Sequence, residues 1–177
     1  MTLDQYLRAA ADDPRWTELV DGEMIVQEPR YPHARIQALL IGALTGWELE
    51  VPGRAEVSAP TEVLLTDRDV YGPDVVIVGS RPELTARETL RALPLIVAEV
   101  RSPSTWRHDI GRKKAVYEAS GVPELWLVDG VAAEILVFRR SAPGAATYNR
   151  SLELTVEDEL TSPLLPGFAL PLRRLFR

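Results

Sequence analysis

Apolar residues recur along the chain with two different spacings, and each spacing predicts a type of element. A spacing of three to four residues predicts helices over about residues 3–13, 33–47 and 107–120. Thr2 followed by Gln5 is typical of a capping box at the start of the first helix. Gly121 and Pro123 predict the end of the third helix.

Shorter apolar runs, several of them alternating with polar residues, predict strands. The segment TELVDGEMIVQEP predicts a hairpin, because Asp21-Gly22 lies between two apolar runs. Further strands are predicted for AEVSAP, TEVLLT, DVVIV, PLIVAEV, ELWLVDG and AEILVFRR, the last two joined by a tight turn at Asp129-Gly130. Residues 80–93 are polar and rich in Arg and Glu, so we expect a surface segment with at most one helical turn. Short strands and turns are expected from Ala142 onward.

The order of these elements predicts the fold class. Helix, hairpin, helix, several strands, helix and further strands indicate an α/β or α+β fold, a mixed β-sheet flanked by helices. The chain has 177 residues and no internal repeat or linker, so we expect a single domain over residues 1–177.

The amino-acid composition excludes several kinds of site and of protein. The chain has no Cys, which excludes disulfides, thiolate zinc sites and cysteine nucleophiles. Its apolar runs are far shorter than the roughly 20 residues of a membrane helix, and its start does not look like a signal peptide. We therefore expect a cytoplasmic protein that does not enter a membrane.

Charge is distributed unevenly along the chain. The net charge of −6 argues against a protein that coats nucleic acid without specificity. Residues 101–114, however, hold five cations and one acid. A basic strip on an acidic body suggests a local anion site, although a solvated helix face would have the same composition.

Glu99 is the first residue with candidate chemistry. Alternation along the strand over residues 94–101 places Glu99 on one face with Val97, and both faces are otherwise apolar. A carboxylate at the end of a buried strand needs a cation, a metal ion or a proton. An ion pair with Arg101 or with a lysine would satisfy it without any catalytic role.

Asp74 supplies a second carboxylate at the start of the buried strand DVVIV, directly after a Gly-Pro turn. Turn chemistry alone could explain an Asp at this position. Two carboxylates at the ends of neighbouring buried strands could also converge, and hard oxygen ligands suit Mg²⁺ or Mn²⁺. The backbone carbonyl of Val100 could add a third ligand.

The helix over residues 107–120 contributes Asp109, Lys113 and Tyr117, which share one face at i, i+4 and i+8. An ordinary Asp-to-Lys helix pair would give the same spacing. In the functional interpretation Lys113 points back toward Glu99, where an ammonium could orient a metal-bound water. Lys114 lies about 100° around the helix and is expected to face solvent or a DNA phosphate.

The motifs around these residues resemble a known family. YGPDVVIV, PLIVAEVRSPST and RHDIGRKKAVYEASGVPELWLVDG are together similar to the Uma-two family of putative restriction endonucleases, in the PD-(D/E)XK nuclease superfamily. Pro73-Asp74 matches the PD element and Glu99 the acidic element. The resemblance implies a restriction-endonuclease-like core, a Mg²⁺- or Mn²⁺-dependent endonuclease acting on DNA, and a homodimer.

The chain departs from the superfamily pattern two positions after Glu99, where Arg101 replaces the motif lysine. Arginine is a poor general base, so we expect Arg101 to bind substrate phosphate. The resemblance implies that Lys113 takes over the task of the lysine. Glu23 and His33 fall in the upstream DGE…P…H pattern of the family and could lie at the rim of the site.

Two other functions remain open at this stage. A protein that keeps the nuclease fold without turnover could bind nucleic acid, and both Arg101 and the net charge of −6 favour it. A small-ligand protein whose basic strip binds a nucleotide is the third candidate.

Overall fold

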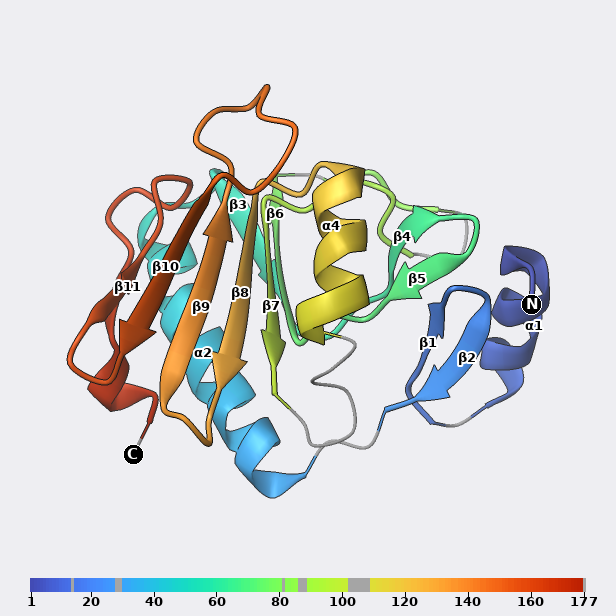
Figure 1. The fold of residues 1–177 in the computed structure, drawn as a ribbon, viewed down its shortest axis with the longest axis horizontal. Helices are drawn as coiled ribbons and strands as arrows, with labels where there is room; N and C mark the ends of the chain where they lie inside the picture. The colour runs from blue at the N-terminus through green and yellow to red at the C-terminus, as the bar shows by residue number, and fades with distance from the viewer. Residues whose placement is uncertain (14, 28–29, 81, 86–88, 102–108, 177) are drawn as a thin grey trace.

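A six-stranded mixed sheet forms the centre of the molecule in the computed structural model (Figure 1). The structure describes residues 1–177 except 14, 28–29, 81, 86–88, 102–108 and 177. The strands follow the order β10 (Arg150–Thr155), β9 (Glu134–Arg139), β8 (Glu124–Asp129), β7 (Ile96–Val100), β6 (Val75–Gly79) and β3 (Ala55–Ser58). Strands β7 and β8 are parallel, and the other pairs of this sheet are antiparallel.

Helices cover both faces of this sheet, so its central strands are buried on both sides. Helix α2 (Tyr31–Glu50) packs on one face through Leu40, Leu44 and Trp47, and α4 (Lys114–Ser120) packs on the other through Tyr117. Every residue of β7 and of β8 is buried. This burial explains why both strands are nearly continuous runs of apolar residues.

The connection between β7 and β8 brings the third helix over the sheet. Parallel neighbours need a crossover, and here it includes a π-helical turn, η1 (Asp109–Lys113), that continues into α4. The crossover returns Lys113 and Tyr117 to the face of the sheet on which Glu99 lies.

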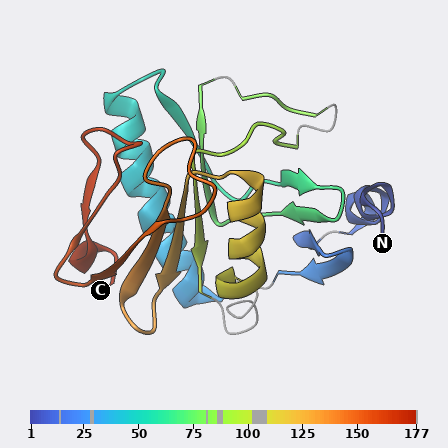
Figure 2. The same cartoon turned by 45° about the horizontal axis from the view of Figure 1, so that its top comes forward.

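A smaller antiparallel sheet joins the face that α4 covers. Its order is β2 (Glu23–Val26), β1 (Thr17–Val20), β5 (Asp69–Tyr71) and β4 (Val63–Thr66), and α1 (Leu3–Asp12) packs against β1 (Figure 2). Asp21 and Gly22 both have positive φ, as a two-residue hairpin turn requires. At the other end of the molecule, β11 (Glu159–Thr161) and β12 (Ala169–Pro171) form a hairpin that leads into η2 (Leu172–Arg174). Apolar residues of this segment belong to the same hydrophobic core as those of α2.

The predicted fold class is confirmed: a mixed sheet is flanked by helices, and the capping box and the Asp21-Gly22 hairpin are present. Four details differ. Strand β5 was not expected, and the Asp129-Gly130 turn is a longer loop over residues 130–133 in which Ala133 has positive φ. The described part of residues 80–93 contains isolated bridges at Leu84 and Leu90 in place of a helical turn. The described part of the third helix starts with a π turn at Asp109, whose spacing the 3.6-residue period does not predict.

Within the described residues, none of the helices combines the length and the apolar character needed to cross a bilayer.

Candidate active site

Asp74 and Glu99 lie at adjoining ends of the two central antiparallel strands. Strands β6 and β7 pair Val75 with Ala98, so Asp74 and Glu99 each lie one position beyond this pair. The amide of Val100 donates a hydrogen bond to Asp74 Oδ2 at 2.7 Å. The Asp74 side chain is therefore hydrogen-bonded to the residue that follows Glu99.

Two residues of helix α2 contact Asp74. His33 Nε2 lies 3.0 Å from Asp74 Oδ2, and Gln37 Nε2 donates to the backbone carbonyl of Asp74 at 2.9 Å. Because His33 and Gln37 are four residues apart on one helix, they meet the same turn of chain. His33, predicted from the family pattern to lie at the rim, thus contacts the PD aspartate directly.

Glu99 is contacted by residues of η1 and α4. Its Oε1 accepts hydrogen bonds from Tyr117 Oη at 2.6 Å and from Lys113 Nζ at 3.2 Å. Glu99 and Lys113 are 4% and 3% exposed. Lys113 and Tyr117 are one α-helical turn apart, which explains why both reach one carboxylate.

Glu18 of β1 completes this cluster from the smaller sheet. Its Oε1 accepts a hydrogen bond from Lys113 Nζ at 2.8 Å and one from the Gly72 amide at 2.7 Å. Gln27 donates to the other carboxylate oxygen. One buried ammonium is thus shared by two buried carboxylates from different sheets.

The two other predicted cations have protein partners. Arg101, at the position of the motif lysine, forms an ion pair with Asp129 at the end of β8. The Lys114 ammonium lies 4.6 Å from the centre of the Phe138 ring and 5.7 Å from that of Tyr148. Lys113, and not Lys114, is the lysine of this helix that contacts Glu99.

A third acidic group, Asp69, borders the cluster from β5. Burial raises its pKa, but hydrogen bonds from the Asp21 amide, Thr66 and Tyr71, together with the nearby Arg112 guanidinium, outweigh that effect and lower it. Arg112 Nη2 lies 3.3 Å from Asp69 Oδ1. Burial, with the hydrogen bond to Asp69, raises the pKa of Tyr71 above that of a free phenol. Asp69 is therefore a stable anion beside Arg112, a cation that it shares with Asp21.

The other predicted site residues are Glu23 and Asp109. Glu23 is exposed at the start of β2, after the hairpin turn. The backbone of Asp109 lies in η1, whereas its side chain is outside the described residues, as are Arg107 and His108. Glu18 and Gln37 were not predicted. Glu18 carried the same signal as Glu99, a lone acid in a short apolar strand, while Gln37 carried none.

The donor chemistry of this strand end fits a hard divalent cation. Asp74 and Glu99 offer carboxylate oxygens beside the Val100 backbone, and Mg²⁺ binds through one or two carboxylates while keeping several waters. Among the residues that the structure describes, no group of three His, Cys, Asp or Glu side chains could hold a metal ion. A bound ion would therefore depend on these two carboxylates, Val100 and water.

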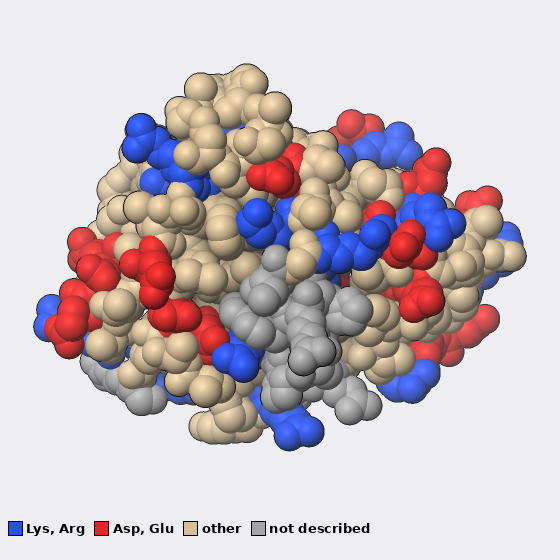
Figure 3. All heavy atoms as spheres, viewed as in Figure 1, with Lys and Arg blue, Asp and Glu red and all other residues tan. Residues whose placement is uncertain are grey.

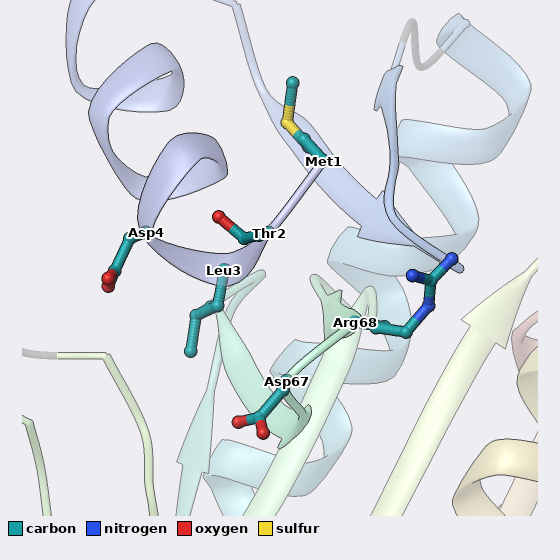
Figure 4. A pocket seen from close by; sticks show the side chains of 6 residues that line it. All are labelled: Met1, Thr2, Leu3, Asp4, Asp67 and Arg68. Atoms are coloured by element: carbon teal, nitrogen blue, oxygen red, sulfur yellow. The ribbon is translucent and has the colours of Figure 1, made fainter.

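The surface over this region carries charges of both signs. Figure 3 shows Lys and Arg side chains gathered over α4, with Asp and Glu side chains on either side. A pocket of about 400 Å³ lies elsewhere, at the start of α1 and the β4–β5 turn (Figure 4). It is lined by Met1, Thr2, Leu3, Asp4, Asp67 and Arg68. None of the candidate site residues lines it.

Comparison with known proteins shows the family and the fold of the chain. The sequence profile of the Uma2 family, described as "Putative restriction endonuclease", matches residues 3–173. A crystal structure of a putative nuclease belonging to DUF820 from Anabaena variabilis has the same fold, with a TM-score of 0.78 and 17% sequence identity. The alignment covers 99% of this chain and 97% of that one. No curated protein matches. Since the family profile spans nearly the whole chain, the protein belongs to the Uma2 family of restriction-endonuclease-like proteins.

Proposed function

We propose that this protein is a metal-dependent endonuclease that hydrolyses phosphodiester bonds in DNA. The observation that carries the proposal is the juxtaposition of Asp74 and Glu99 at adjoining strand ends, with Lys113 on Glu99. Membership of a family described as restriction endonucleases supports the same reaction class.

Each of these residues would have a different role in hydrolysis. Asp74, Glu99 and the Val100 carbonyl would hold Mg²⁺ or Mn²⁺, which lowers the pKa of a bound water and polarises the phosphoryl group. Lys113 orients the attacking water and stabilises negative charge on the phosphate. Tyr117 fixes the Glu99 carboxylate through its hydrogen bond, and His33 with Gln37 fixes Asp74.

Binding of DNA needs cations that reach phosphates. Arg101 is about one-third exposed while it pairs with Asp129, so an incoming phosphate could compete with Asp129 for its guanidinium group. Cleavage of both strands needs two sites, so we expect two copies of the chain to act together on DNA.

A plasmid-nicking assay with Mg²⁺ or Mn²⁺ tests the proposal. Wild type is expected to convert supercoiled DNA to the nicked form only when the metal is present, and Glu99→Ala and Asp74→Ala are expected not to. Metal-independent cleavage, or equal cleavage by both variants, would refute it. Light scattering of the DNA complex measures whether two copies bind.

A second function, DNA binding without turnover, is favoured by one observation. The position of the motif lysine holds Arg101, and its partner is Asp129 on the neighbouring strand. If this replacement has ended catalysis, wild type would bind DNA and Mn²⁺ but cut nothing. The nicking assay, paired with a DNA-binding measurement, separates the two functions.

A further inference from the structure

Glu18 stands out among the acidic residues because it belongs to the smaller sheet yet contacts the candidate site. It lies on β1 and is 1% exposed. Its Oε1 is 2.8 Å from Lys113 Nζ, closer than Glu99 Oε1, which is 3.2 Å away. Glu18 is therefore the nearer of these two carboxylates to the ammonium.

The same carboxylate also holds the chain that leads to Asp74. Glu18 Oε1 accepts the Gly72 amide at 2.7 Å, two residues before Asp74, and Gln27 donates to Oε2. A substituent at Gly72 would meet the Trp16 ring at 2.6 Å, so this turn is also closely packed. Glu18 thus connects Lys113 with the segment that positions Asp74.

We propose that Glu18 is a positioning residue for Lys113, keeping the ammonium at the site when Glu99 serves as a metal ligand; this inference rests on the proposed function. A buried ammonium needs an anionic partner, because burial of an unpaired charge is costly. If a metal ion binds the Glu99 carboxylate, the ion pair between Glu99 and Lys113 becomes weaker. Among the described carboxylates that contact Lys113, Glu18 is the one that is not a proposed metal ligand, and it reaches Lys113 from a different sheet.

The test compares Glu18→Gln with a matched control, Glu124→Gln. Glutamine keeps the shape of the side chain and an acceptor for Gly72 while it removes the charge that holds Lys113. Glu124 is also a fully buried glutamate in an ion pair, with Arg139, but it contacts none of the site residues. Both variants are measured for nicking kinetics and for reductive methylation of Lys113 relative to Lys114, read by mass spectrometry.

In Glu18→Gln we expect Lys113 to be methylated faster relative to Lys114, and kcat to fall about 10- to 100-fold with KM for DNA unchanged. Glu124→Gln should alter neither the labelling ratio nor kcat per folded molecule. Glu18→Asp keeps the charge on a shorter side chain, so its labelling ratio and its kcat should lie between those of wild type and Glu18→Gln. Glu18→Asp is used in place of Glu18→Gln if the latter does not fold.

The labelling ratio decides the positioning role even if wild type cuts no DNA, in which case the proposed function fails by itself. An unchanged ratio in the Glu18 variant, or an equal change in Glu124→Gln, would overturn the inference. If wild type is active and the ratio rises while kcat stays at the wild-type value, the inference is overturned as well.

Discussion

Two buried glutamates on neighbouring parallel strands differ in how their charges are compensated. Glu124 begins β8 and Glu99 lies near the end of β7, and they are 0% and 4% exposed. Glu124 has a cation of its own: Arg139 donates two hydrogen bonds to it, at 2.7 and 2.9 Å, and Trp126 and Ser162 add two more. Glu99 instead shares Lys113 with Glu18.

The difference separates a structural pair from a candidate active site. The bidentate Arg139–Glu124 pair satisfies both carboxylate oxygens with a planar fork, the geometry that makes such pairs strong. Lys113 is a compact charge on a flexible stem, and Asp74 lies beside the same strand end. A carboxylate that shares its cation can exchange partners more readily, as a metal ligand must.

The largest expected effect follows from removing the charge of each glutamate. Glu99→Gln should leave a folded protein without metal-dependent nicking, because it removes a proposed metal ligand. Glu124→Gln should keep nicking per folded molecule while lowering the free energy of unfolding by about 3 kcal/mol, since Arg139 is left without its anion. Nicking kinetics and urea unfolding measure the two. If Glu124→Gln also stopped the chemistry, the distinction between the two glutamates would be lost.

A second comparison uses the adjacent lysines. Lys113→Met should abolish nicking, because the ammonium on Glu99 is removed. Lys114→Met should keep kcat and lose about 0.5–1 kcal/mol of stability, the size of its contact with the Phe138 and Tyr148 rings. Any loss of DNA affinity in Lys114→Met would appear as a salt dependence smaller by about one phosphate contact. Equal loss of kcat in both variants would argue against a specific role for Lys113.

Arg101→Lys tests whether the departure from the superfamily pattern has cost activity. If Lys113 does the work of the motif lysine, Arg101→Lys should keep most of the activity and lose some DNA affinity, because the fork geometry is gone. The nicking rate at saturating DNA measures this. An inactive wild type that gains cleavage through Arg101→Lys would instead support the binding function.

A further effect concerns Asp69, which resembles Glu99 in sharing its cation: Arg112 lies close to both Asp69 and Asp21. Its pKa is lowered in the folded state, so its stabilisation is present above the ordinary Asp pKa of about 3.9 and is lost as pH falls through the folded value. Asp69→Asn should therefore lower stability by about 1–3 kcal/mol at pH 7 and flatten the decline below about pH 4. Urea titrations at several pH values measure the free energy of unfolding. If its decline below about pH 4 is the same in Asp69→Asn as in wild type, the lowered pKa of Asp69 is contradicted.

Much of the fold could be predicted from the sequence because the relevant signals are local. The capping box at Thr2, the Asp21-Gly22 turn and the apolar runs of β6, β7 and β8 each depend on a few neighbouring residues. Strand β5 was missed because it has only three residues; it pairs with the adjacent β4 and with β1, a strand that is distant in sequence. Element type is thus more predictable than pairing.

The site was predictable in part for the same reason. Glu99 and Lys113 are fourteen residues apart across one crossover, so alternation and helical spacing suggested their contact as one of two interpretations. Glu18 is 95 residues from Lys113 in sequence, and its role depends on how the smaller sheet packs on α4. The partner of Arg101 depends on the register of β7 and β8, which no spacing in the sequence specifies.

The central claim, that the Asp74–Glu99 strand end holds a catalytic metal ion, is tested most directly by Mn²⁺ binding followed by electron paramagnetic resonance. Wild type and Glu124→Gln are expected to bind Mn²⁺ with the same affinity, whereas Asp74→Asn and Glu99→Gln are expected to lose this site. Binding that is unaffected by both Asp74→Asn and Glu99→Gln, or a wild type that takes up no Mn²⁺, would contradict the claim.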